Sequence, residues 1–106
     1  MTGMELASAA RYGLNPIVIV LNNQGYGTER PMLDGAFNDV ADWRYSKVPE
    51  VLGTGLGFLI KTERDLGEAL TEAKSYDDLC ILEVLLEKND ISVPLQRLCK
   101  NLATRV

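Results

Sequence analysis

The fold is decided at residues 17–29, which read IVIVLNNQGYGTE, an unbroken apolar run followed at once by amides and glycines. The run Ile17–Leu21 is apolar on both faces, which is typical of a parallel strand covered by helices on both sides. Asn and Gly directly after a strand are often plain turn residues. They also stand where parallel α/β sheets bind ligands, at the carboxyl end of a strand. Both interpretations stay open on pattern alone.

Two further apolar runs predict strands, at Phe58–Ile60 and at Cys80–Leu86, where Glu83 is the one charged residue. Three segments place apolar or small residues at the i, i+3, i+4 and i+7 spacing of an amphipathic helix. A fourth, shorter helix is expected around Pro49–Leu52. The residues of the three periodic segments are Leu6, Ala9, Ala10 and Gly13; Leu66, Ala69, Leu70 and Ala73; and Leu95, Leu98, Cys99 and Leu102.

Start signals precede each of the three longer helices, and the small face of the first helix predicts close packing on a sheet. The alternation of helices and strands predicts an α/β fold, a partial doubly wound parallel sheet of three strands with helices on both faces, in one domain over residues 1–106. It is expected to be partial because no strand precedes the first helix. The start signals are Thr2 with Glu5, Thr62 with Asp65, and Ser92 with Pro94.

Composition narrows the possible functions. The net charge of -4, with 11 scattered basic residues, argues against nucleic acid or an anionic membrane as a partner. Histidine is absent, which excludes Ser-His-Asp and Cys-His nucleophiles and imidazole zinc sites. Cys80 and Cys99 are expected to be buried free thiols, which suits the cytoplasm. The longest purely apolar run, Ile17–Leu21, is too short to span a bilayer.

The residues after the first strand offer oxygen ligands at a suitable spacing. The amide oxygen of Asn23 and the backbone carbonyl of Gly25, two residues on, could both face one hard cation. Mg²⁺ prefers such oxygens and takes its remaining ligands from water and phosphate. Glu29 would then lie near whatever the metal holds.

A resemblance to a known enzyme family extends along the whole chain. Its main stretches are TGMEL at 2–6, LNNQGYGTE at 21–29, FNDV at 37–40, Trp43, 45–53 and 90–92. Together they resemble the diphosphate-binding domain of thiamine diphosphate-dependent 2-oxo acid decarboxylases, the pyruvate and indolepyruvate decarboxylase group. The Tyr-Gly-x-Glu continuation is typical of that branch and not of acetolactate synthases.

The resemblance implies thiamine diphosphate and Mg²⁺ as cofactors, with Asn23 and Gly25 as magnesium ligands. Tyr26, Gly27 and Thr28 belong to the same cofactor-binding stretch. Glu29 matches the family's active-site glutamate, which serves proton transfers while a 2-oxo acid loses carbon dioxide and leaves as an aldehyde. The first helix is expected to direct its positive end toward the diphosphate. The implied partners are the 2-oxo acid, the pyrimidine-binding domain of the parent enzyme and further copies in a homo-oligomer.

The chain also departs from the family pattern. The family's Gly-Asp-Gly, whose Asp is a metal ligand, would fall just before Met1, and the strand preceding it and the pyrimidine-binding domain are not in this sequence. Neutral oxygens alone hold Mg²⁺ poorly, so weak or no cofactor binding and no decarboxylation are expected of this chain alone. Thr28 stands where decarboxylases often carry a bulkier aliphatic residue.

Two other functions remain as alternatives. One is a non-enzymatic interaction module or split subunit, which pairs through an exposed sheet edge with a chain that supplies the missing strand. In that case Ile17–Leu21 becomes an apolar edge that invites oligomerisation or aggregation. The other is an unrelated flavodoxin-like binding domain, which the run from Asn23 to Glu29 does not favour.

Overall fold

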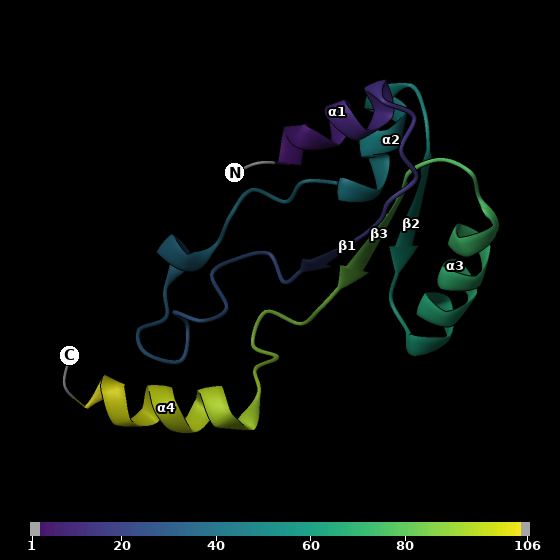
Figure 1. The fold of residues 1–106 in the computed structure, drawn as a ribbon. Coiled ribbons are helices and arrows are strands. Elements are labelled where there is room, and N and C mark those ends of the chain that lie inside the picture. Colours follow the sequence, from purple (N-terminus) through teal and green to yellow (C-terminus); the bar gives the residue numbers. More distant parts are fainter. Residues whose placement is uncertain (1–2, 105–106) are drawn as a thin grey trace. The chain divides into compact units, whose positions relative to one another are not determined.

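Helices and strands alternate along the chain, as the sequence predicts (Figure 1). The computed structural model describes residues 3–104. Short 3-10 turns precede α1 and α2 and interrupt the long segment after β1; they are η1 (Gly3–Glu5), η2 (Ala36–Asn38) and η3 (Tyr45–Lys47). The regular elements are α1 (Leu6–Arg11), β1 (Ile17–Asn22), α2 (Val48–Leu52), β2 (Leu56–Ile60), α3 (Glu63–Ser75), β3 (Cys80–Leu85) and α4 (Val93–Ala103).

The described residues divide into two compact units, each made of two separate segments of the chain. The first unit contains residues 3–21 and 44–85, which carry the sheet, α1, α2 and α3. The second contains residues 22–43 and 86–104, the loop after β1 together with α4. The chain therefore crosses from one unit to the other more than once.

The sheet is parallel, with the strand order β1-β3-β2. β2 and β3 pair in register from Leu56 opposite Cys80 to Ile60 opposite Val84. Where β1 meets β3, the N–H of Cys80 donates to the carbonyl of Pro16 at 2.9 Å. The predicted doubly wound parallel fold of three strands is confirmed, and β1 lies at an edge of the sheet.

One face of the sheet is covered by α3. Thr62 caps this helix as predicted, because its Oγ1 accepts a hydrogen bond from the N–H of Asp65 at 3.1 Å. The small residues Ala69 and Ala73 are buried, which lets the helix lie close to the strands. The buried core cluster consists of Ile60, Ala69, Ala73, Cys80 and Leu82.

The opposite face of β2 and β3 is covered by η3 and α2. Gly57 of β2 lies directly under the backbone of Ser46, where a Cβ would collide with the Ser46 carbonyl. Glu83 of β3 is buried on this face and accepts a hydrogen bond from the Ser46 N–H at 3.0 Å. Helices therefore lie on both faces of the sheet, as expected, and Glu83 is a paired carboxylate.

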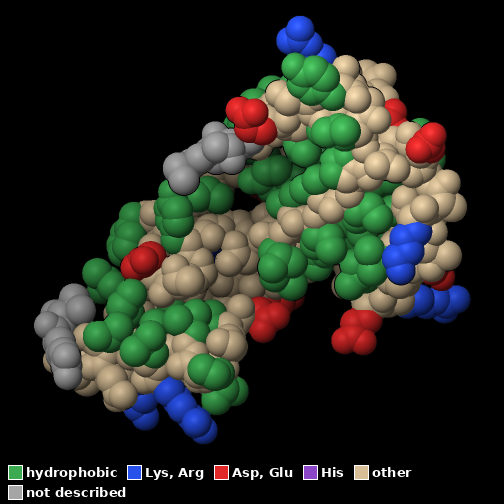
Figure 2. All heavy atoms as spheres, viewed as in Figure 1, with side chains coloured by type: hydrophobic (Ala, Val, Ile, Leu, Met, Phe, Trp, Pro, Cys, Tyr) green, Lys and Arg blue, Asp and Glu red, His purple; other side chains and the backbone are tan. Residues whose placement is uncertain are grey.

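β1 departs from the expectation of a strand covered on both sides. The bond from Cys80 to Pro16 sets Ile17 beside Cys80, so Ile17, Ile19 and Leu21 lie on the face that α3 covers over the other strands. Their exposed fractions are 38%, 50% and 67%. α3 packs on β2 and β3, and these three side chains of β1 stay partly exposed to solvent. Hydrophobic side chains gather over the strands on the face in view in Figure 2.

α1 is shorter and less buried than its pattern predicts. It ends at Arg11, and Gly13 adopts a left-handed φ of 65° just beyond it. None of its residues is fully buried, and Leu6, Ala9 and Ala10 of the predicted small face are half-buried. The predicted cap Thr2 lies outside the described residues. Across residues 3–104, no helix combines the length and the apolar character needed to cross a bilayer.

Candidate functional site

The candidate site begins where β1 ends, and all of its predicted residues belong to the second unit. Two consecutive Asn side chains fold back on the chain there. The Oδ1 of Asn22 accepts from the N–H of Gln24 at 3.1 Å, and the Oδ1 of Asn23 accepts from the N–H of Gly25 at 3.4 Å. Gln24 takes a left-handed φ of 62°. This is the turn geometry that Asn promotes, and it turns the Asn23 amide toward Gly25.

Gly25 lies opposite Asp39 in an isolated antiparallel bridge. The flanking bonds run from the N–H of Tyr26 to the carbonyl of Asn38 at 2.8 Å and from the N–H of Val40 to the carbonyl of Gln24 at 3.1 Å. In this pairing the N–H and C=O of Gly25 point away from Asp39. The Gly25 carbonyl accepts no hydrogen bond from another described residue. Gly25 is half-buried, and its carbonyl lies on the side toward which the Asn23 amide turns.

Arg30 is buried behind this bridge, with 6% of its side chain exposed. Its Nη2 donates to the Oδ1 of Asp39 at 2.6 Å and to the carbonyl of Asn38 at 3.5 Å, and its Nη1 donates to the Oδ1 of Asp34 at 3.2 Å. The bond to Asp39 is the main reason that the pKa of Arg30 is raised and that of Asp39 lowered. Lys88 adds a second cation to Asp39 at 3.4 Å.

Asp34 is the second carboxylate of this cluster. Its Oδ1 accepts from the side-chain amide of Asn38 and from the N–H of Gly35 as well as from Arg30. These bonds, that from Asn38 first, hold the pKa of Asp34 below its ordinary value. The loop after β1 therefore has a small ionic core of its own, made of Arg30, Asp34, Asn38 and Asp39.

Glu29 lies in a helical turn in which its N–H donates to the carbonyl of Tyr26 at 3.1 Å. Its side chain is exposed, and its carboxylate forms no hydrogen bond or ion pair with another described residue. The predicted proton carrier is accessible and close in sequence to the candidate ligands. It does not contact Asn23 or Gly25.

The other residues of the predicted cofactor-binding stretch have different surroundings. Tyr26 is 58% exposed. Gly27 lies against the side-chain amide of Asn23, which occupies the place of a Cβ. Thr28 is exposed, while its carbonyl contacts the Sγ of Cys99 in α4 at 3.9 Å. Both Cys99 and Cys80 are buried free thiols, as predicted.

The described residues contain no acidic or sulfur-rich metal centre. No group of three or more His, Cys, Asp or Glu side chains within residues 3–104 is arranged to hold a metal ion. Asn23 and Gly25 offer neutral oxygens only. Such a pair suits Mg²⁺ that takes its other ligands from phosphate and water, and it does not suit zinc or a redox metal.

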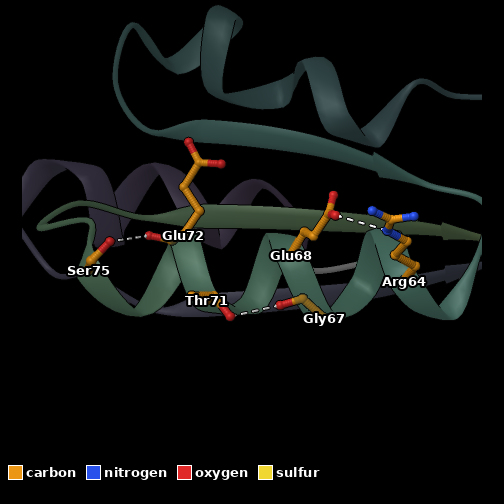
Figure 3. A pocket seen from close by; sticks show the side chains of 6 residues that line it. All are labelled: Arg64, Gly67, Glu68, Thr71, Glu72 and Ser75. Carbon is orange, nitrogen blue, oxygen red and sulfur yellow. Dashed lines mark hydrogen bonds and ion pairs between the residues drawn. The ribbon is translucent and has the colours of Figure 1, made fainter.

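A shallow depression on α3 is unrelated to these residues (Figure 3). Several of its polar groups have partners within the helix, such as Arg64 with Glu68 at 3.2 Å and the Thr71 hydroxyl with the Gly67 carbonyl at 3.0 Å. It contains none of the predicted site residues. The residues that line it are Arg64, Gly67, Glu68, Thr71, Glu72 and Ser75.

The spacing of Asn23, Gly25 and Glu29 predicted them as site residues. The sequence did not predict that Arg30 and Asp39 hold the loop after β1 together. Asp39 entered only as part of a resembling stretch. One signal pointed to them: Arg30 precedes two aspartates within nine positions in a segment of irregular structure. An Arg close to aspartates in a long irregular segment indicates a buried ion pair.

Residues 1–84 match the sequence profile of the family described as thiamine pyrophosphate enzyme, C-terminal TPP binding domain. This range contains β1, β2, the loop after β1 and every residue of the candidate site.

Curated relatives are similar over most of this chain. An alpha-keto-acid decarboxylase of Mycolicibacterium paratuberculosis (strain ATCC BAA-968 / K-10) is 38% identical over 96 residues, which cover 86% of this chain and 17% of that protein. The protein of the same name from Mycobacterium ulcerans (strain Agy99) is 32% identical over 108 residues, covering 97% and 19%. That from Mycobacterium tuberculosis (strain ATCC 25618 / H37Rv) is 34% identical, again covering 97% and 19%. The chain thus spans less than a fifth of the length of these relatives.

Proposed function

The chain belongs to the thiamine pyrophosphate enzymes, as part of their C-terminal TPP binding domain, and from this membership we propose that it contributes half of the diphosphate and magnesium site of a 2-oxo acid decarboxylase. The observation that carries the proposal is the Gly25 carbonyl, which has no hydrogen-bond donor among the described residues, beside an Asn23 amide turned toward Gly25. Both lie in the segment that matches the family.

In this proposal the side-chain oxygen of Asn23 and the main-chain oxygen of Gly25 bind Mg²⁺. Water and the diphosphate of the cofactor complete its coordination, as is usual for Mg²⁺ in proteins. Tyr26, Gly27 and Thr28 continue the cofactor-binding stretch. Gly27 is needed because the side-chain amide of Asn23 fills the space that a Cβ would take.

Thiamine diphosphate, when bound, supplies the carbanion-stabilising centre for loss of carbon dioxide. Glu29 acts on protons: its carboxyl group donates one to the substrate carbon from which carbon dioxide departs, so that an aldehyde is released. Its exposed carboxylate, which has no partner among the described residues, is free to exchange protons with water. The names of the relatives support a 2-oxo acid as the substrate.

Catalysis requires parts beyond this sequence in our proposal. The pyrimidine-binding domain, a carboxylate ligand for the metal and the contacts of a homo-oligomer would come from the rest of such an enzyme. The chain alone is therefore expected to bind the cofactor weakly and to produce no aldehyde. Its two buried free thiols favour a reducing compartment, the cytoplasm.

The proposal is testable on the chain as it stands, with Mn²⁺ as a paramagnetic substitute for Mg²⁺. In amide-resolved NMR, substoichiometric Mn²⁺ added with thiamine diphosphate should broaden the resonances of residues 23–27. Asn23→Ala should abolish this broadening. The acidic residues of α3, Glu63, Asp65, Glu68 and Glu72, serve as an internal control for non-specific cation binding.

Broadening that is strongest at residues 23–27 and that requires thiamine diphosphate supports the proposal. Broadening that is confined to α3, or that is the same with and without the cofactor, contradicts it. The method responds to weak binding and to the position of the metal, so it does not depend on turnover.

An interaction role is a second candidate, and the edge strand β1 favours it. Ile17, Ile19 and Leu21 are exposed along one face of this edge strand. A chain that supplied a further strand would pair with the β1 backbone and cover these side chains. Light scattering after size exclusion would reveal it as a stable oligomer even without cofactor or metal.

A further inference from the structure

We propose that Arg30 is a positioning residue, which fixes the Gly25 carbonyl in place for the metal. This inference rests on the proposed function of Gly25 and extends it to a residue with no direct part in ligand binding.

The guanidinium of Arg30 is fixed from both of its ends. Nη1 binds Asp34, and Nη2 binds Asp39 and the carbonyl of Asn38. Only 6% of the side chain is exposed. A buried planar cation with carboxylates on two sides has a single favourable orientation, and the rigid guanidinium of Arg can bridge two carboxylates in this way where Lys cannot.

Gly25 packs directly against the guanidinium group of Arg30. A Cβ at Gly25 would collide with the Nη2 of Arg30 and with the carbonyl of Asn38. The same Asn38 carbonyl accepts the N–H of Tyr26 at 2.8 Å. Arg30 and the bridge to Asp39 therefore close off one side of Gly25, and its carbonyl is directed to the other side. If Arg30 moves, the Gly25 backbone loses the surface against which it rests.

The ion pairs around Arg30 affect the proposed metal site by positioning the backbone and not by their net charge. Arg30 and Lys88 carry two positive charges, and Asp34 and Asp39 carry two negative charges, so the group is neutral at pH 7. Neutrality means that Arg30 provides little long-range attraction for a diphosphate. Its contribution lies in where it holds the backbone, which is the role of outer groups around metal ligands.

The two aspartates allow a matched comparison. Both bind Arg30, but only Asp39 stands opposite Gly25 and also binds Lys88. Loss of the Asp39 charge should disturb Gly25, while loss of the Asp34 charge should leave the bridge in place. Arg30→Met removes the guanidinium group. Arg30→Lys keeps the positive charge but lacks the planar group that binds both aspartates.

The test measures the affinity for Mn²⁺ with thiamine diphosphate, from the broadening of residues 23–27, in the wild-type chain and four variants. Arg30→Met should weaken binding about tenfold or more. Arg30→Lys should recover part of this loss, Asp39→Asn should weaken binding in the same direction, and Asp34→Asn should weaken it less than Asp39→Asn. Amide shifts of β2, β3 and α3 should stay unchanged in all variants.

A readout independent of ligand accompanies the affinities. In Arg30→Met the amide resonances of Gly25, Tyr26 and Val40 should shift. In Arg30→Ala, added guanidinium ion at a non-denaturing concentration should return these resonances toward their wild-type positions and restore binding, which a general loss of stability would not allow.

The outcomes separate the two proposals. If the wild-type chain shows no cofactor-dependent broadening at residues 23–27, the proposed function fails and this inference fails with it. If the wild type binds but Arg30→Met binds equally well with unshifted Gly25 and Tyr26 amides, only the role of Arg30 is overturned. Equal losses of affinity in Asp34→Asn and Asp39→Asn would likewise overturn it. They would show that binding depends on the charge of the loop and not on the position of the Gly25 backbone.

Discussion

Glu83 accepts a hydrogen bond from the backbone N–H of Ser46 at 3.0 Å, although the two residues are 37 positions apart in the sequence. The bond joins the central strand β3 to η3, the turn that leads into α2. It gives a physical reason for a carboxyl group inside an apolar strand, because a buried polar group is tolerated where it is hydrogen-bonded.

Glu83→Ala should lower the free energy of unfolding by about 2 kcal/mol, because the partly buried N–H of Ser46 would lose its acceptor. Urea unfolding followed by far-ultraviolet circular dichroism measures this change. Glu72→Ala, at an exposed position of α3, is the matched control and should change stability by less than about 0.5 kcal/mol. Equal effects of the two substitutions would contradict the importance of the bond.

Gly25→Ala should destabilise the loop after β1 by about 1–3 kcal/mol, since the added methyl group collides with Arg30 and the Asn38 carbonyl. Hydrogen exchange at the amides of Tyr26 and Val40 should become faster. Gly67→Ala in α3 meets nothing within 4 Å and should stabilise the helix by about 0.5–1 kcal/mol. A Gly25 variant with unchanged exchange at both amides would show that the site has room.

The ionic core of the loop should be lost in acid. The pKa values of Asp34 and Asp39 are both below the ordinary 3.8. Their stabilising contribution is therefore complete above the pKa of the unfolded chain, and it disappears as pH falls through the lowered folded values. We expect the amides of residues 24–40 to lose protection below about pH 4. Asp39→Asn should flatten this dependence; an identical profile in that variant would refute it.

Both thiols should react slowly in the folded chain. Cys80 and Cys99 are 0% and 1% exposed, and burial raises the pKa of the Cys80 thiol. Thiol reagents at pH 8 should modify Cys80 only when the sheet opens. Cys99 should react sooner, because α4 holds it against Thr28 without a sheet around it. Mass spectrometry of the modified peptides gives the two rates, and faster modification of Cys80 would contradict this order.

Association of the chain should depend on the exposed face of β1. Ile19→Lys places a charge among apolar side chains on an edge strand, which natural proteins use to prevent edge pairing. Light scattering over a concentration series should show more monomer than in the wild type. Leu59→Lys, on β2 at the other edge and equally 50% exposed, is the control. Similar effects of both variants would show that β1 has no special role.

Local patterns predicted most of the elements because the interactions that form them are local. Thr62 and Ser92 cap α3 and α4 by bonds to residues three positions on. Every predicted strand is present, with ends shifted by two residues or fewer. The order β1-β3-β2 was not predicted, because it depends on how the connections cross the sheet and not on any single segment.

The site was predictable in part for the same reason. The turn that brings Asn23 to Gly25 involves neighbours in the sequence, so spacing alone suggested it. The freedom of the Gly25 carbonyl depends on pairing with Asp39, fourteen positions away, within a segment that lacks a regular period. The exposure of Ile19 likewise depends on how far α3 extends across the sheet. The sequence of β1 alone therefore does not predict it.

The second unit contains residues from before and after position 84, where the match to the family ends. Lys88 and Cys99 lie beyond that point, yet they contact Asp39 and Thr28 within it. A shortened chain cut at the end of the match would keep β1, β2 and all of β3 except Leu85, while the loop after β1 would lose its contacts with Lys88 and Cys99. Anyone who trims, fuses or transplants this segment should therefore carry α4 along with it.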